Sequence, residues 1–140
     1  MILATKKSGR QISDVRLIAV TKKFSCSAIQ SAIDSKIYYV GESRVQETAQ
    51  KLTNFTKRKK IEIHLIGKLQ KNKVRKAIKL YDVIQTINTI SLAEKINIIS
   101  KEENTIQRIY LQVNTGKDPK KQGFNPNELL KSSIEINKLP

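Results

Sequence analysis

The stretch Leu17-Ile18-Ala19-Val20-Thr21-Lys22 is a short apolar run that ends in two polar residues. It is too short for a helix and rich in aliphatic side chains, so it predicts a buried strand. Further runs of this kind follow at residues 37–40, 61–66, 83–87 and 109–113. Their starts lie about 20 to 26 residues apart, which leaves room for one helix and two short loops between parallel strands. The sequence therefore predicts a β/α repeat.

The segments between these runs carry the helical period. Apolar residues fall on one stripe, opposite a lysine-rich face, at Val74, Ala77, Ile78 and Tyr81, and on a shorter stripe at Cys26, Ile29 and Ile33. Ser91 followed by Glu94 has capping-box spacing and predicts the start of the helix after the fourth strand. Asn125 followed by Pro126 predicts the N-cap and first position of the last helix.

Alternating strands and helices fit two architectures, an open doubly wound sheet or a closed (β/α)₈ barrel. The first strand leads into Thr21-Lys22-Lys23-Phe24, without the glycine-rich loop of a dinucleotide fingerprint or a P-loop. We expect the α/β class and a partial (β/α)₈ TIM-type barrel with about five of the eight β/α units. Residues 1–14 are predicted to be a lead-in, the remnant of an N-terminal helix, and residues 15–140 an incomplete barrel domain.

Composition narrows the class of protein. A chain of 140 residues with 39% hydrophobic residues is long enough for one domain with a core. It contains neither a run of about 18 apolar residues nor a basic-then-apolar leader, so we expect a cytoplasmic protein with no membrane partner. The single cysteine, Cys26, cannot form an internal disulfide, and one histidine is too few for a structural zinc site. We therefore expect no metal.

The net charge of +15 raises the question of nucleic acid. The basic residues cluster at 57–60 and 68–79, yet the chain has only three Phe, four Tyr and no Trp to stack on bases. The lysine excess is typical of a solvated surface. We expect no specific nucleic-acid partner, and any binding to be non-specific and dependent on salt.

Lys22 is the first candidate for chemistry. Strand alternation places it on one face with Ile18 and Val20. If this face lines a barrel mouth, the Lys22 ammonium is partly desolvated, which favours the neutral amine that forms a Schiff base. The alternative is that Lys22 is simply solvated, as most of the 27 Lys and Arg residues must be.

Polar residues also follow or interrupt the other strands. Gly41-Glu42-Ser43-Arg44 comes directly after the second run, and His64, the only histidine, lies inside the third. A histidine in a strand is commonly a satisfied core residue, so its role is open. Tyr110, Gln112 and Asn114 form a polar stripe on the fifth strand, which suits either a ligand-lined barrel mouth or a structural network.

Four ordered motifs give the chain a family resemblance. They are Leu17-Ile-Ala-Val-Thr-Lys22, Val40-Gly-Glu-Ser-Arg-Val-Gln-Glu47, Ile63-His-Leu-Ile-Gly-Lys-Leu-Gln-Lys-Asn-Lys73 and Leu111-Gln-Val-Asn-Thr-Gly116, the last followed by Lys121-Gln-Gly-Phe124. With these motifs the chain resembles the pyridoxal phosphate homeostasis protein family, from about residue 8 to its end. That family is similar to the barrel domain of alanine racemase.

The resemblance implies a barrel at residues 15–140 that holds pyridoxal 5′-phosphate (PLP) as a Schiff base on Lys22. It implies a non-catalytic carrier in intracellular PLP and vitamin B6 homeostasis rather than a racemase. PLP-dependent apoenzymes could be its partners. Ser43 and His64 fall where such proteins line or support the cofactor pocket. The family usually has Asn where this chain has Ser43, so one contact on the cofactor side could be lost.

Two hypotheses remain open. The first is a PLP carrier without turnover. The second is a non-functional or split-gene fragment that needs a partner chain to supply strands six to eight of the barrel. In either case five strands leave two open edges, through which the chain could form an oligomer.

Overall fold

The computed structural model describes residues 2–140, which form one sheet of five parallel strands. The strands pair in chain order: β1 (Ile18–Val20), β2 (Tyr39–Glu42), β3 (Glu62–Leu65), β4 (Val83–Ile87) and β5 (Arg108–Leu111). Because the strands are parallel, their carboxyl ends meet at one edge of the sheet. The predicted α/β class and β/α repeat are confirmed.

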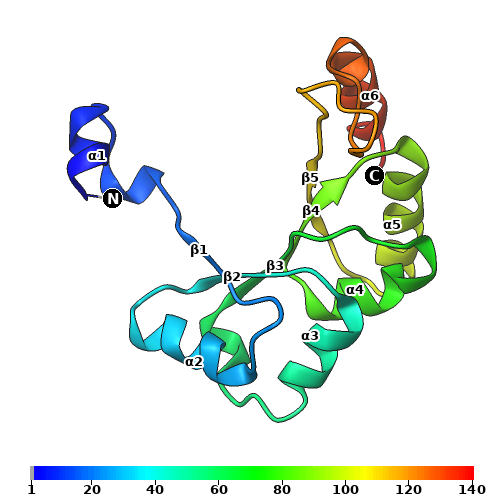
Figure 1. The fold of residues 1–140 in the computed structure, drawn as a ribbon. Coiled ribbons are helices and arrows are strands. Elements are labelled where there is room, and N and C mark those ends of the chain that lie inside the picture. The colour runs from blue at the N-terminus through cyan, green and yellow to red at the C-terminus, as the bar shows by residue number, and fades with distance from the viewer. Residues whose placement is uncertain (1) are drawn as a thin grey trace.

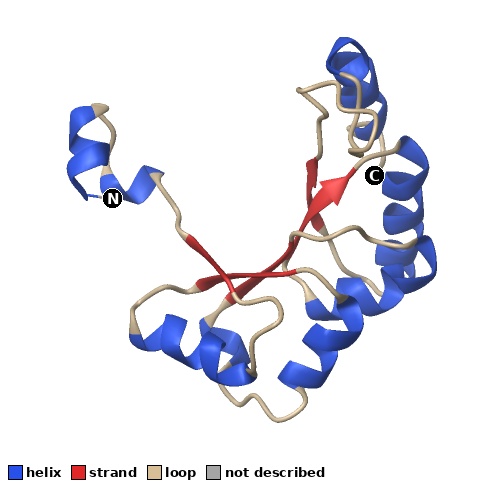
Figure 2. Ribbon diagram, viewed as in Figure 1, coloured by secondary structure: helices blue, strands red, loops and turns tan. Residues whose placement is uncertain are grey.

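Helices connect the strands and lie along one side of the sheet, as Figures 1 and 2 show. The helices are α1 (Ile2–Lys7), α2 (Cys26–Asp34), α3 (Val45–Leu52), α4 (Val74–Leu80), α5 (Ile90–Glu102) and α6 (Leu129–Ile136). In Figure 2, helices α2 to α5 follow the outer side of the curved sheet, and no described helix lies over its inner side. None of the helices in residues 2–140 is long and apolar enough to cross a membrane.

The predicted lead-in contains α1 and a 3₁₀ turn at Ile12–Asp14. Figure 1 shows α1 at the end of an extended segment, away from the other helices. The first residue lies outside the described part of the chain. The division between a lead-in at 1–14 and a barrel domain at 15–140 stays a prediction.

One predicted helix start was wrong. The helix after β4 is capped by Thr89, whose Oγ1 accepts a hydrogen bond from the Leu92 amide at 3.2 Å, and not by Ser91. Ser91 lies in the first turn of α5, where its hydroxyl accepts a hydrogen bond from Lys71. The prediction for the last helix is confirmed, because Asn125 Oδ1 accepts a hydrogen bond from the Asn127 amide at 3.1 Å and Pro126 opens a 3₁₀ turn before α6.

The hydrophobic core lies between the sheet and the helices. The fully buried aliphatic residues that build it come from alternate positions of the strands and from one stripe of each helix: Ile29, Val40, Ile63, Leu65, Val74, Ala77, Ile84 and Ile87. These residues match the predicted runs and stripes. Burial of this apolar face is the main force that holds the helices on the sheet.

The opposite, inner face of the sheet carries a different set of side chains. The strand register aligns Ile18, Tyr39 and Glu62 in one row, and Val20, Gly41 and His64 in the next. Val20 is half exposed, as is Tyr110 of β5. This face corresponds to the interior of a barrel; the described helices do not cover it, and its outer strands are partly exposed while His64 is buried.

Gly67 allows the loop after β3 to approach the loop after β2. A Cβ at this position would lie 2.2 Å from the Ser43 carbonyl oxygen and 2.7 Å from Ser43 Cα, which are backbone atoms that cannot move aside easily. Glycine is therefore required where these two strand-end loops meet.

We predict that Gly67→Ala lowers the free energy of unfolding by about 1–3 kcal/mol, because the added methyl group overpacks this contact. Chemical denaturation measures the change. Gly116→Ala is the matched control, since a Cβ there meets no atom within 4 Å. Equal stability of the two variants would contradict the prediction.

Candidate functional site

Lys22 lies directly after β1, at the carboxyl edge of the sheet where functional groups of β/α proteins gather. Its side chain is exposed. Among the described residues it forms neither a hydrogen bond nor an ion pair. Lys22 therefore presents a free primary amine at the strand ends.

A buried polar network lies next to Lys22, on the helix side of the sheet. Glu42, the last residue of β2, is fully buried, and its carboxylate accepts a hydrogen bond from Thr21 Oγ1 at 2.8 Å. Lys51 of α3 reaches Glu42 Oε1 at 2.9 Å and also donates to the Thr21 carbonyl at 2.9 Å. One buried ion pair thus joins the ends of β1 and β2 to α3.

Glu47 extends this network to Lys23, the residue that follows Lys22. Glu47 Oε1 lies 2.8 Å from Lys51 Nζ, four residues further along α3, and accepts a hydrogen bond from the Lys23 amide at 2.7 Å. The contact with Lys51 lowers the pKa of Glu47 most, and the hydrogen bond from the Lys23 amide lowers it further. Lys23 itself adopts a left-handed backbone conformation with φ of 67°, which few residues other than glycine adopt.

Ser43 follows β2 and is half-buried. Its backbone packs against Gly67, as described above, and its hydroxyl forms no hydrogen bond within residues 2–140. The register of β1 and β2 pairs Val20 with Gly41, so two residues further on Lys22 and Ser43 lie at neighbouring strand ends. The structure thus brings these two predicted residues to the same edge.

His64 occupies the inner face one row before that edge, in register with Gly41. Its side chain is only 5% exposed. Its Nδ1 lies 2.8 Å from Gln85 Nε2, and its Nε2 lies 3.0 Å from Glu62 Oε1. The second contact is short but misaligned for a hydrogen bond, and neither atom has another partner among the described residues. His64 is therefore a buried polar residue of the inner face.

Charged and aromatic neighbours surround this histidine. Arg108 of β5 pairs with Glu62 at 2.8 Å, and the Tyr39 ring meets the His64 ring edge-on with centroids 6.2 Å apart. Burial lowers the pKa of His64 below 6.5, because desolvation outweighs the attraction of the Glu62 carboxylate. His64 is thus favoured as the neutral imidazole.

The polar stripe on the fifth strand holds a loop together. Gln112 Nε2 donates to the Gln122 carbonyl at 2.7 Å, and Asn114 Nδ2 donates to the Asp118 carbonyl at 2.8 Å. Gly123 lets this loop close, since a Cβ there would lie 2.6 Å from the Asn114 amide. The polar stripe could have lined a ligand site or formed a structural network, and the Gln112 and Asn114 amides form a structural network.

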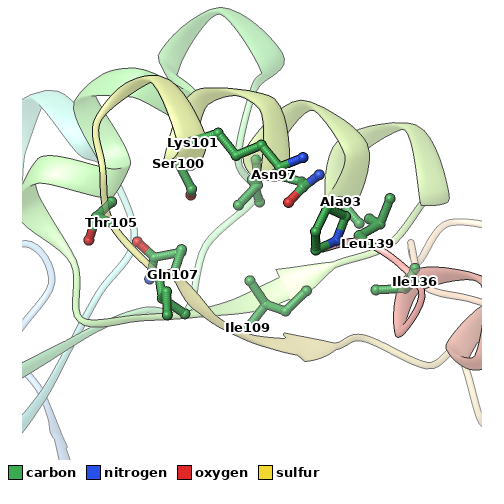
Figure 3. Close-up of a pocket in the computed structure, with 12 residues that line it drawn as sticks. Ala93, Asn97, Ser100, Lys101, Thr105, Gln107, Ile109, Ile136 and Leu139 are labelled. Carbon is green, nitrogen blue, oxygen red and sulfur yellow. The ribbon is translucent and has the colours of Figure 1, made fainter.

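An apolar hollow lies away from the strand ends, between α5, β5 and α6. Figure 3 shows Ala93, Asn97 and Ser100 on one side of it and Ile109 and Ile136 on another. Lys22, Ser43 and His64 do not line it. The described residues contain no group of three or more His, Cys, Asp or Glu side chains that could share a metal ion.

The sequence analysis quoted Glu42 and Glu47 within motifs but predicted no role for them, and it did not consider Lys51. Two signals were available. Glu42 directly follows an apolar strand, where a carboxylate needs a partner. Glu47 and Lys51 are spaced i and i+4 on the following helix, the orientation that favours an ion pair.

The model of the family "Alanine racemase, N-terminal domain" matches residues 5–140. The chain belongs to this family. Among its members, the pyridoxal phosphate homeostasis protein of Haemophilus influenzae is 32% identical over 138 residues, which cover 98% of this chain and 58% of the relative. The protein of the same name from Synechocystis is 34% identical over 115 residues, covering 82% of this chain and 53% of the relative. The resemblance predicted from the motifs is confirmed, and the chain spans little more than half the length of these relatives.

Solved structures of the family support the fold. PipY of Synechococcus elongatus with PLP bound is 34% identical with a TM-score of 0.84, and the match covers 99% of this chain and 63% of PipY. An alanine racemase of Clostridium difficile has a TM-score of 0.78 at 22% identity and covers 99% of this chain and 36% of the racemase, so it shows the fold alone. The prediction of a partial barrel is confirmed.

We predict that the His64 imidazole titrates with a midpoint below 6.5 in the folded chain. As the pH falls below 6.5, the unfolded state binds the proton first, so the free energy of unfolding falls until the lowered folded-state pKa is passed. His64 is the only histidine, and NMR of its ring protons follows it alone. His64→Gln should remove this part of the pH dependence of stability, and a midpoint at or above 6.5 would contradict the burial argument.

Proposed function

We propose that the chain binds PLP covalently through Lys22 and serves in intracellular PLP homeostasis. The free Lys22 amine at the carboxyl edge of the sheet carries this proposal. Lys22 would hold PLP as a Schiff base between its side-chain nitrogen and the aldehyde carbon of the cofactor, with loss of one molecule of water. Ser43 would lie beside the bound cofactor, and the neutral His64 would support its pocket from the row below.

The residues fit an aldehyde cofactor. Lys22 offers an unpaired amine, while the neighbouring Lys51 is buried in ion pairs and is not free to react. The names of the relatives and the PLP-bound PipY structure support cofactor binding over the alternative of a non-functional fragment. PLP supplies an electrophilic aldehyde and an electron sink, and the protein supplies the amine and its orientation.

We further propose that this binding involves no turnover. The similarity to homeostasis proteins supports a carrier, whereas the similarity to racemases extends only to the fold. PLP-dependent apoenzymes as recipients and a cytoplasmic location stay predictions.

We predict that PLP, trapped on the chain by borohydride reduction, is found on Lys22. Lys22→Ala should remove this adduct and the visible absorbance that accompanies it. The measurement is peptide mass spectrometry of the reduced protein. Lys68→Ala is the matched control, since Lys68 is also exposed and also follows a strand, β3, at the same edge of the sheet. An unchanged spectrum in Lys22→Ala would show that other surface lysines bind the aldehyde, and the proposal would fail.

We also predict that the 140-residue chain associates through its sheet edges. Within residues 2–140, β1 and β5 each pair on one side only, and unpaired ladder groups favour pairing between copies. Size-exclusion chromatography with light scattering should show a mass above that of the monomer. Tyr110→Lys adds a charge to half-exposed β5 and should shift the mass toward the monomer. A compact monomer with both outer strands protected from hydrogen exchange would contradict the prediction.

A further inference from the structure

The two peptide groups that flank Lys22 are both held by side chains of α3. The group before Lys22 is held by its carbonyl, because Thr21 O accepts a hydrogen bond from Lys51 Nζ at 2.9 Å. The group after Lys22 is held by its amide, because Lys23 N donates to Glu47 Oε1 at 2.7 Å. Glu47 and Lys51 are themselves 2.8 Å apart. The backbone of Lys22 is thus fixed on both sides by one ion-paired couple.

Burial fixes the Lys51 end of this couple, while the Glu47 side chain is 25% exposed. The Lys51 side chain is 8% exposed and Glu42 is fully buried, so the Lys51 ammonium has little freedom to leave its partners. Its contacts with both carboxylate oxygens of Glu42, at 2.9 and 3.1 Å, fix its direction further. Thr21 is tied to the same carboxylate by its hydroxyl. The residue before Lys22 therefore has both its side chain and its carbonyl anchored.

The conformation of Lys23 is an independent observation. Lys23 shares its left-handed backbone with Lys36, Asn104 and Lys117, and each such non-glycine residue carries strain that its surroundings must offset. The turn after β1 contains no glycine that would adopt this conformation without strain. Two hydrogen bonds constrain this turn: the Lys23 amide donates to Glu47 at 2.7 Å, and the Phe24 amide donates to the Thr21 carbonyl at 3.2 Å.

We propose that Glu47 and Lys51 are positioning residues that direct the Lys22 amine toward the aldehyde group of PLP. This inference rests on the proposed function, since it concerns how Lys22 meets PLP. The lysine side chain stays free, while its Cα and the direction of its Cα–Cβ bond are fixed by the two held peptide groups. A nucleophile fixed in this way reaches the attack geometry more often than one on a loose turn.

The test compares Glu47→Ala and Glu47→Gln in the full chain. Each protein is mixed with PLP, reduced with borohydride at timed intervals, and digested so that adducts on Lys22, Lys23 and Lys68 are counted separately. In Glu47→Ala the initial rate at Lys22 should fall about tenfold, the factor expected for loss of one charge-assisted hydrogen bond. The rate at Lys68 should not change. Glu47→Gln should restore most of the Lys22 rate, because its amide oxygen still accepts the Lys23 bond.

The matched control is Glu94→Ala, which removes an exposed carboxylate from α5 that has no partner among the described residues. Hydrogen exchange without PLP gives a second readout: the peptide at residues 21–25 should exchange faster in Glu47→Ala than in Glu47→Gln or Glu94→Ala. An unchanged Lys22 rate or unchanged exchange in Glu47→Ala would overturn the positioning role alone. Absence of any Lys22 adduct in the unaltered chain would overturn the proposed function and the positioning role with it.

Discussion

The buried carboxylate of Glu42 sets a constraint that the first half of the structure must satisfy. A fully buried charge is costly unless a cation and further hydrogen bonds compensate it. Lys51 supplies the cation from α3, and Thr21 supplies a hydroxyl from the end of β1. Burial alone would lower the pKa of Lys51, but its hydrogen bonds to Glu47 and Glu42 outweigh this and raise it. The ends of two strands and one helix must therefore assemble together.

The sheet separates two kinds of polar network. On the helix side, Glu42 and Lys51 lie among aliphatic residues and hold the strand ends in place. On the inner side, His64 contacts Gln85 of β4 at 2.8 Å and lies 3.0 Å from Glu62, in a face that the described helices leave uncovered. The first network holds the backbone at the strand ends, while the second lies on the face that corresponds to a barrel interior.

Local signals predicted the fold well, because apolar runs and helical stripes are short-range features of the chain. β4 matches its predicted run from Val83 to Ile87, and Val74, Ala77, Ile78 and Tyr81 are all buried as their stripe predicted. The prediction of Ser91 as the N-cap was wrong because Thr89, two residues earlier, supplies a hydroxyl at the position where the helix begins after β4. The network at Glu42 could not be predicted fully, since Thr21, Glu42 and Lys51 meet only after parallel pairing brings distant residues together.

Binding of PLP at Lys22, as proposed, requires selectivity for one amine among 21 lysines, which local basicity alone does not provide. Exposed lysines share the same chemistry, and each has a flexible stem whose ordering costs up to about 2 kcal/mol of side-chain entropy. Ordering the whole Lys22 side chain would cost this conformational entropy. It would also require a partner for the amine, which would then no longer be free. Anchoring Thr21 and Lys23 instead orders only the backbone, so the amine stays unpaired while its range of positions narrows. A fixed backbone beneath a free side chain is therefore the arrangement that combines reactivity with position at this strand end.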